Sequence, residues 1–378
     1  MPRSRLYWLP MGVLTASHAL VFLIACSFVN WFIAGVVAGG LYALTVTRFT
    51  SALRDRPRPR WVTRLLDEPV FWLWGAAMLA LLGFPFELVA AAGLSLADVS
   101  RGFTFGQWLR AGALDVYLLG LLLSAWTIWG ARRFVRVRKM EVVIAGLPRE
   151  FDGYRVLQLS DLHVGSFDRL SRAKKWAELA NAERPDLCVV TGDLVTSGSA
   201  FYADVAAALS ELSAPDGVCV AMGNHDQTDN DLLTRLLEAR KLVVLRNASR
   251  VLRRGAASLT IAGLDDRFAR RADLAQTLET CPGGVPIILL AHYPTSFDAA
   301  CDAGIALVLS GHTHGGQLGI PFLAQRYNLA KLTGQRSRGL VQRGGSTLYV
   351  NAGLGTTGPP MRLGVPPELA VFTLRGQK

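Results

Sequence analysis

Most of the histidines in this chain belong to one set of residues that also contains aspartates and an asparagine. Of the six histidines in 378 residues, five fall in this set. Its members are Asp161, His163, Asp193, Asn224, His225, His292, His312 and His314. Each alone fits a polar residue satisfied at a strand end, but gathering all of them without a cation would be electrostatically costly. Because imidazoles and carboxylates bind divalent metals, the set predicts a site for a pair of such ions.

Short apolar runs precede these residues and are the elements that must position them. The runs are too short for helices and too continuous for strands with an exposed face, so we expect buried strands. They cover residues 155–160, 187–192, 218–223, 286–291 and 305–311, with helices expected at 170–182 and 231–240. Ligands bind at the carboxyl ends of strands in open α/β sheets, so five strands can deliver distant residues to one place.

The order of these motifs resembles the signature of the calcineurin-like metallophosphoesterases. The resemblance covers about residues 140–378 and rests on Asp161-Leu162-His163, Gly192-Asp193, Gly223-Asn224-His225-Asp226, His292 and Gly311-His312-Thr313-His314. The segment from Gly311 to Gln317 further resembles a bacterial, membrane-associated subfamily that includes transmembrane proteins with such a domain. The resemblance implies an α/β fold, a four-layer α-β-β-α sandwich, in residues 140–378.

The resemblance also implies a role for each matching residue. The first metal would be held by Asp161, His163 and His314, and the second by Asn224, His292 and His312. Asp193 would bridge two ions about 3.5–4 Å apart. The ions would activate water for in-line attack on phosphorus, and His225 would protonate the leaving group. Asp226 is expected to fix the tautomer of His225, although an acidic residue there can also be solvated or capping.

Metal identity and substrate contacts are less strongly specified. The mixed nitrogen and oxygen ligands favour Mn, Fe or Zn over Mg or Ca, and the resemblance makes manganese the first choice. Arg338 and Arg362 are the candidates for contacting a phosphate or headgroup, against the alternative of ordinary surface arginines. Asp265 and Asp266 either border the site or start an irregular segment.

The first 139 residues differ from the rest in being long apolar stretches, as in a membrane domain. A helical span needs about 20 apolar residues, and four spans are expected, at about 6–27, 31–49, 69–93 and 108–130. Asp115 lies in the fourth, either as a functional polar site or as a solvated or paired carboxylate. An all-α membrane domain, residues 1–139, should therefore precede the α/β domain, residues 140–378.

Basic residues are concentrated beside these spans. Residues 1–140 contain 15 Lys and Arg against 6 Asp and Glu, whereas residues 141–378 contain 25 against 23. The excess is explained by the positive-inside bias and anionic lipids, so no nucleic-acid partner is expected. Six arginines between Arg48 and Arg64 and five basic residues between Arg132 and Lys139 outweigh Arg101 and Arg110, which predicts an inner-membrane protein with its catalytic domain in the cytoplasm.

The N-terminus and the cysteines give further indications of whether the catalytic domain is cytoplasmic or exported. Leu23-Ile24-Ala25-Cys26 is an alternative lipoprotein cleavage box, but a further apolar helix follows it. Several family members of this type are exported with a twin-arginine signal, which this N-terminus lacks, and that departure favours the cytoplasm. The five cysteines form no Cys-x-x-Cys pair, and Cys188 and Cys219 are expected to be buried in a reducing compartment.

The motifs indicate phosphoester hydrolysis without naming the substrate. A site held at the bilayer suggests an amphiphilic substrate, and related membrane-associated enzymes cleave the pyrophosphate of UDP-2,3-diacylglucosamine in lipid A synthesis. The alternatives are a broad-specificity phosphodiesterase or phosphomonoesterase on soluble substrates, and a membrane sensor or scaffold with a degenerate metal site. The complete set of ligands speaks against degeneracy.

Overall fold

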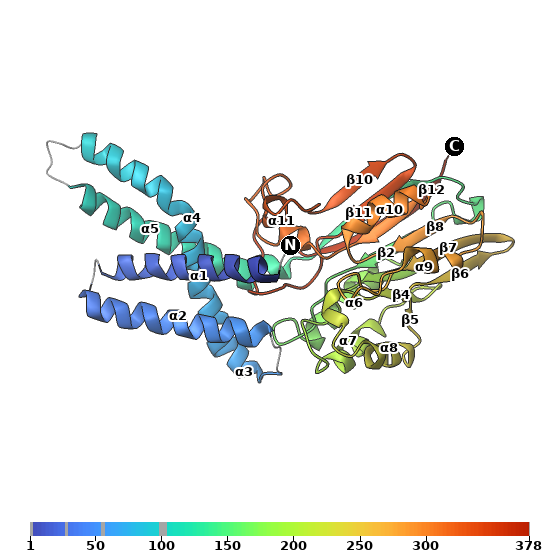
Figure 1. Ribbon diagram of the computed structural model, residues 1–378, viewed down its shortest axis with the longest axis horizontal. Helices are drawn as coiled ribbons and strands as arrows, with labels where there is room; N and C mark the ends of the chain where they lie inside the picture. Colours follow the sequence, from blue (N-terminus) through green and yellow to red (C-terminus); the bar gives the residue numbers. More distant parts are fainter. Residues whose placement is uncertain (1–2, 27–28, 54–56, 98–103, 378) are drawn as a thin grey trace. The chain divides into compact units, whose positions relative to one another are not determined.

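The computed structural model describes residues 3–26, 29–53, 57–97 and 104–377. These form two compact units (Figure 1). A helical unit comprises Met1–Ala52, Arg58–Ala131 and Gly358–Met361, and a sandwich unit comprises Leu53–Pro57, Arg132–Thr357 and Arg362–Lys378. The predicted boundary at residue 139 therefore falls later than the observed one. Arg54, Arg56 and Arg101, which entered the prediction of orientation, lie outside the described residues.

Four long helices make up most of the helical unit. They are α1 (Arg3–Ala25), α2 (Trp31–Leu53), α4 (Glu68–Ala97) and α5 (Phe105–Ala125), with short helical turns α3 (Arg60–Val62), η1 (Thr63–Asp67), η2 (Trp126–Gly130) and η3 (Ala131–Arg133). Among the described residues, three stretches are long and apolar enough to cross a membrane, Trp31–Arg48, Arg60–Ala97 and Phe105–Arg133. The first helix contributes a shorter apolar stretch, Gly12–Ala25. Each predicted span thus overlaps a helix, and three of these helices contain a stretch that is long and apolar enough to cross a membrane.

Helices α4 and α5 pack closely because small residues and side-chain hydrogen bonds line their contact. A Cβ on Gly120 would lie 2.6 Å from the Ala76 carbonyl oxygen, so only glycine permits this approach. Trp72 Nε1 donates to the Leu121 carbonyl at 2.8 Å, and Ser124 Oγ donates to the Trp72 carbonyl at 2.9 Å. Asp115 lies on α5 and is exposed.

Two six-stranded sheets form the sandwich unit. The first has the order β1-β12-β2-β3-β4-β5 and the second β10-β11-β9-β8-β7-β6, with parallel and antiparallel neighbours in both. The strands of the first are β1 (Arg136–Ile144), β2 (Arg155–Leu159), β3 (Leu187–Thr191), β4 (Val218–Ala221), β5 (Val243–Val244) and β12 (Glu368–Gly376). Those of the second are β6 (Ala248–Arg254), β7 (Ala257–Gly263), β8 (Ile287–Leu290), β9 (Leu307–Ser310), β10 (Gly339–Arg343) and β11 (Ser346–Val350).

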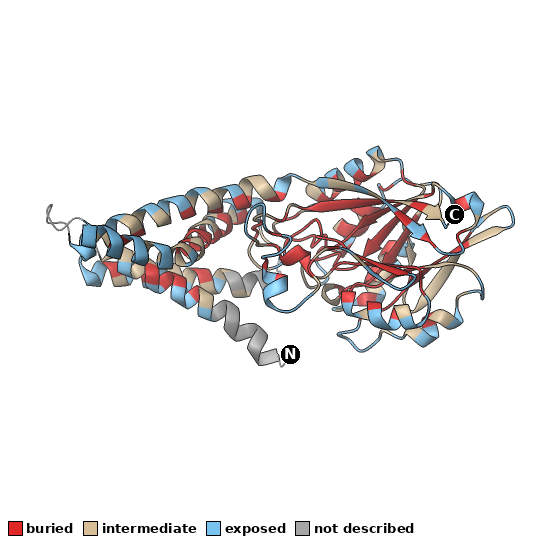
Figure 2. Cartoon of the chain, turned by 90° about the horizontal axis from the view of Figure 1, so that it is seen from above, coloured by how far each residue is buried: buried red, intermediate tan, exposed pale blue. Residues whose placement is uncertain are grey.

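Helices cover the outer face of each sheet, which confirms the four-layer α-β-β-α prediction. Apolar residues of α6 (Leu170–Ala182), α7 (Tyr202–Leu209) and α8 (Asn230–Glu238) pack on the first sheet, and those of α9 (Leu274–Glu279) and α10 (Phe297–Asp302) pack on the second. A third cluster fills the space between the sheets. Figure 2 shows the buried residues concentrated in these strands. The remaining elements are η4 (Arg149–Phe151), η5 (Asn224–Asp226), η6 (Pro294–Ser296), η7 (His314–Gly316) and α11 (Leu329–Leu332).

All five predicted strands are present, each within a few residues of its predicted bounds, and so are the helices at 170–182 and 230–238. In β3, β4 and β9 every residue is buried, because the sheets are covered on both faces. This packing supplies the hydrophobic free energy that holds the polar strand ends in place.

Candidate metal centre

The loops that leave β2, β3, β4, β8 and β9 carry all the predicted metal ligands. Two groups of ligand atoms converge, each with its members within 4.8 Å of one another. The first contains Asp161, His163, Asp193 and His314, and the second contains Asp193, His292 and His312. Asp193 belongs to both groups, which is the position that a bridging carboxylate requires. The structure thus brings six of the seven predicted ligands together.

Unusual backbone conformations aim these side chains inward. Asp161, His163, Asp193, His312 and His314 all have φ between 45° and 71°, in the left-handed region that residues with a Cβ seldom adopt. Such conformations persist only where the surrounding structure imposes them, and they cluster at functional sites. Of the eleven non-glycine residues with positive φ in the described chain, five are predicted ligands, so such conformations are enriched at this site.

Close backbone approaches at glycine complete the geometry. A Cβ on Gly311 would lie 1.9 Å from Ser160 Oγ and 2.3 Å from Asp161 Oδ2. The backbone N–H of His312 then donates to Asp161 Oδ1 at 3.0 Å, and Ser160 Oγ donates to Asp161 Oδ2 at 2.7 Å. Glycine at position 311 lets the loop after β9 fold down onto the carboxylate that follows β2.

The first group has the properties of ligands for a divalent cation. His163 Nε2 lies 3.0 Å from His314 Nε2, and His314 Nε2 lies 3.5 Å from Asp161 Oδ1. Burial lowers the pKa of His163 to about 3, and it also holds the pKa of His314 well below its usual range. Both rings are therefore neutral at pH 7 and offer lone pairs. Burial raises the pKa of Asp161 to about 6, which a cation beside it would reverse.

In the second group, one histidine faces a carboxylate directly. His292 Nδ1 donates to the Thr191 carbonyl at 2.8 Å, which leaves Nε2 facing Asp193 Oδ2 at 3.2 Å. Burial opposes charge on both residues, but their mutual attraction keeps the pKa of Asp193 well below its usual range and raises the pKa of His292 to about 10. Without a metal, a proton on His292 Nε2 would satisfy this contact, and a divalent ion held by both residues would replace that proton. Burial lowers the pKa of His312 to about 4, so that ring is neutral.

His225 is oriented by the backbone and not by the aspartate that follows it. Its Nδ1 donates to the Thr196 carbonyl, which fixes the tautomer and leaves Nε2 available. Asp226 is fully buried, and its carboxylate accepts hydrogen bonds from the backbone N–H groups of Leu194 at 2.8 Å and Gly223 at 2.8 Å. The structure therefore contradicts the prediction that Asp226 fixes the His225 tautomer. Asp226 instead ties the loop after β3 to the loop after β4.

Tyr293 is a functional residue that the sequence analysis missed. Its hydroxyl donates to Asn224 Oδ1 at 2.9 Å, and its ring centroid lies 4.3 Å from that of His312. Burial and the neighbouring Asp266 raise the pKa of Tyr293, so Asp266 does border the site. Asn224 is thereby held beside the second group. The only signal in the sequence was the position of Tyr293 directly after His292.

The two arginines predicted to contact substrate have different environments. Arg362 has 0% exposure, and its guanidinium donates to the carbonyls of Ala352, Gly353 and Gly355 at 2.6–3.1 Å. These bonds give it a structural role, in contrast to the predicted substrate contact. Arg338 is half-buried and donates to Gln325 Oε1 at 3.2 Å, at the end of a segment described below.

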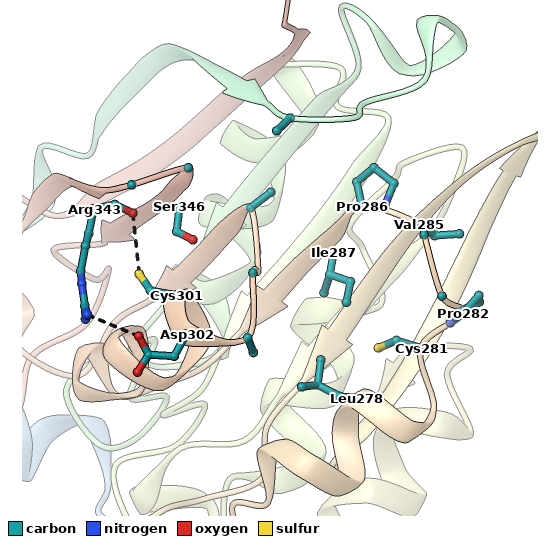
Figure 3. Close-up of a pocket in the computed structure, with 18 residues that line it drawn as sticks. Leu278, Cys281, Pro282, Val285, Pro286, Ile287, Cys301, Asp302, Arg343 and Ser346 are labelled. Carbon is teal, nitrogen blue, oxygen red and sulfur yellow. Dashed lines mark hydrogen bonds and ion pairs between the residues drawn. The ribbon is translucent and has the colours of Figure 1, made fainter.

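A separate cavity of about 590 Å³ lies at the opposite ends of the strands of the second sheet. It is bordered by Ile287 at the start of β8 and Ser346 at the start of β11 (Figure 3). Arg343 in its wall pairs with Asp302 at 3.3 Å. None of the predicted ligands lines this cavity, so the chemistry belongs to the loops at the carboxyl ends.

Comparison with known proteins identifies the family of this chain. Residues 154–316, which include every predicted ligand, match the family model for the calcineurin-like phosphoesterases. The chain is 34% identical to the uncharacterized metallophosphoesterase YkuE of Bacillus subtilis (strain 168), over 61% of this chain and 82% of that protein. It is 33% identical to an uncharacterized metallophosphoesterase of Aquifex aeolicus (strain VF5), over 65% and 93%. It is 30% identical to a transmembrane protein with metallophosphoesterase domain of Danio rerio, over 73% and 67%.

Proposed function

Because this chain belongs to the calcineurin-like metallophosphoesterases, we propose that it is a two-metal hydrolase of a lipid-linked phosphoester or pyrophosphate, with its active site in the cytoplasm. The family and the apolar helices indicate that the protein is a membrane-associated phosphoesterase that uses divalent metal ions. The proposal adds the number and identity of the ions, the substrate, and the side of the membrane on which the active site lies.

The observation that supports a two-metal centre is the sharing of Asp193 between two groups of ligands. A carboxylate has two oxygens, so one residue can contact two ions at the separation found in two-metal hydrolases. Asp161, His163 and His314 would hold one ion, and Asn224, His292 and His312 would hold the other. The mixed nitrogen and oxygen ligands favour Mn, Fe or Zn over Mg or Ca, and the resemblance to the family makes Mn the first choice.

The proposed chemistry assigns distinct tasks to the ions and to the protein. When bound, two divalent ions activate water and neutralise phosphoryl oxygens during an in-line displacement. In its doubly protonated form, His225 would donate the proton on Nε2 to the leaving oxygen and keep the proton on Nδ1, which is hydrogen-bonded to the Thr196 carbonyl. Asp226 accepts from the backbone N–H of Leu194, which follows Asp193, and of Gly223, which precedes Asn224 and His225, so it ties the loops that carry the donor and the ligand together.

The proposed substrate is amphiphilic, with UDP-2,3-diacylglucosamine as the specific candidate. An enzyme anchored by apolar helices meets lipid-linked substrates at high local concentration. The juxtamembrane arginines favour a cytoplasmic active site. A reporter fused after Lys378 tests the side: fluorescence of a cytoplasmic reporter supports the proposal, and activity of a periplasmic alkaline phosphatase reporter contradicts it.

Product analysis by ³¹P NMR tests the substrate. Purified full-length protein with Mn²⁺ is offered UDP-2,3-diacylglucosamine or a soluble nucleotide diester, with His225→Ala as the matched inactive variant. Release of UMP and the acyl-sugar phosphate by the unmodified protein alone supports the proposal. Cleavage of the soluble diester alone would assign a general phosphodiesterase, and no cleavage of either would favour a sensor or scaffold.

A further inference from the structure

The segment directly after the metal loop carries a cluster of exposed apolar side chains. Between Gly319 and Arg338, six large apolar or aromatic residues are 45–105% exposed, Ile320, Phe322, Leu323, Tyr327, Leu329 and Leu332. We call residues 319–338 the apolar loop; it includes α11 (Figure 1). Soluble proteins seldom expose so many large apolar residues together, and such patches mark surfaces that contact a partner or a membrane.

The exposure belongs to a folded platform. Ala324, Asn328 and Ala330 are buried beneath the exposed side chains and anchor the loop to the sandwich. The Asn328 side chain donates to the Ala324 carbonyl at 2.7 Å and accepts from the Lys331 N–H at 3.0 Å, which begins α11. Phe322 has φ 65°, a strained conformation for a bulky residue, and its side chain is 105% exposed. The Phe322 ring is therefore exposed on a backbone conformation that is unfavourable for a bulky residue.

The charge of the apolar loop identifies the partner. It contains Arg326, Lys331, Arg336 and Arg338 and no acidic residue; Arg336 pairs with Asp298 outside the loop at 3.2 Å. The Arg326 guanidinium lies 5.5 Å from the Tyr327 ring centroid, so an aromatic and a cation are presented together. Basic residues interleaved with exposed aromatic and aliphatic ones are typical of surfaces that enter the headgroup region of anionic membranes. A protein partner would have to supply acidic complementarity, whereas three stretches of the helical unit are long and apolar enough to cross a bilayer, which favours a membrane as the partner.

We propose that the apolar loop inserts its apolar side chains into the interface of an anionic bilayer and admits a lipid substrate to the metal centre. The loop starts five residues after His314, and Leu318 and Gly319 bridge to Leu363 and Asn328. The wall of the site and the lipid-contacting surface are thus one continuous segment. The substrate part of this inference rests on the proposed function, whereas the membrane contact does not.

Lipid crosslinking tests the membrane contact without reference to activity. Phe322→p-benzoylphenylalanine is introduced into the full chain, which is reconstituted in nanodiscs of phosphatidylcholine and phosphatidylglycerol and irradiated. The matched control is Leu179→p-benzoylphenylalanine on α6, where the native side chain is 42% exposed. We expect phospholipid adducts at position 322 and none at 179, measured by intact mass. Crosslinks from position 322 only to the chain itself or to another protein would overturn the proposal.

A double variant tests the admission of lipid substrate. Phe322→Ser with Leu332→Ser should leave turnover of a soluble phosphodiester unchanged and lower turnover of a bilayer-embedded phosphodiester by about tenfold, because two apolar anchors are lost. Leu179→Ser is the control and should change neither rate. Equal turnover of the embedded substrate by variant and unmodified protein would overturn this part. If the unmodified protein turned over neither substrate, the proposed function would be refuted. The membrane contact would then be decided by the crosslinking result alone.

Discussion

His225 has one ring nitrogen committed to the Thr196 carbonyl and one left for chemistry. A proton donor held this way contributes to the transition state without holding a metal. We therefore expect His225→Ala to lower kcat by about 10²–10⁴-fold while two ions stay bound. Steady-state kinetics and native mass spectrometry measure the two quantities. Loss of an ion from His225→Ala would show that this residue is a ligand and not an acid.

Tyr293 acts on the site through Asn224. Removing its hydroxyl in Tyr293→Phe frees the Asn224 side chain to rotate, so the affinity for the second ion should fall by about 10–100-fold. Tyr154→Phe is the matched control, because Tyr154 donates to Asp216 at 2.6 Å, outside the metal centre. Metal titration followed by calorimetry distinguishes them. Equal metal affinities in the two variants would contradict a positioning role for Tyr293.

At the scale of elements, the loop after β9 depends on the absence of a side chain at Gly311. A methyl group there would overlap Ser160 and Asp161, so Gly311→Ala should displace Asp161 and reduce kcat/KM by at least about 100-fold. Gly345→Ala, where a Cβ meets no atom within 4 Å, is the control and should retain activity. Anomalous scattering from Mn²⁺ in crystals of both variants shows whether the first ion is lost. Full occupancy in Gly311→Ala would contradict the predicted displacement.

The loop between β11 and β12 is organised around the buried guanidinium of Arg362. Replacing it in Arg362→Met leaves buried carbonyls without donors, so the free energy of unfolding should fall by on the order of 3 kcal/mol. Denaturant unfolding of Arg362→Met measures this loss, with Arg343→Met on exposed β10 as the control. A raised KM with unchanged stability would instead support the substrate contact predicted from the sequence.

The five strands that precede the ligands were predictable from sequence, because each is a short apolar run that ends within a few residues of a potential ligand, as β3 does before Asp193. Three features of the site could not be predicted from the sequence. Thr196 contributes only a backbone carbonyl, so no residue type marks its contact with His225. Tyr293 resembles any buried tyrosine until the fold brings it to Asn224. Arg362 could not be distinguished from a surface arginine, because its burial comes from long-range packing of loops.

At the scale of the whole molecule, the two units have opposite distributions of apolar surface. The helical unit exposes large apolar residues along its length, including Leu82, Phe86 and Leu122 at 68–77%. The sandwich unit buries its apolar residues in three clusters and exposes them mainly in the apolar loop. This contrast is expected when one unit is solvated by lipid and the other by water.

The central claim is that two divalent ions share Asp193, and metal counting tests it most directly. Native mass spectrometry of the active, full-length protein should find two ions per chain, and Asp193→Asn should lose both activity and at least one ion because the shared carboxylate is gone. Restoring Mn²⁺ after chelation should restore turnover only as the second ion binds. Full activity with a single ion, or two tightly bound ions in an inactive Asp193→Asn, would contradict the shared centre.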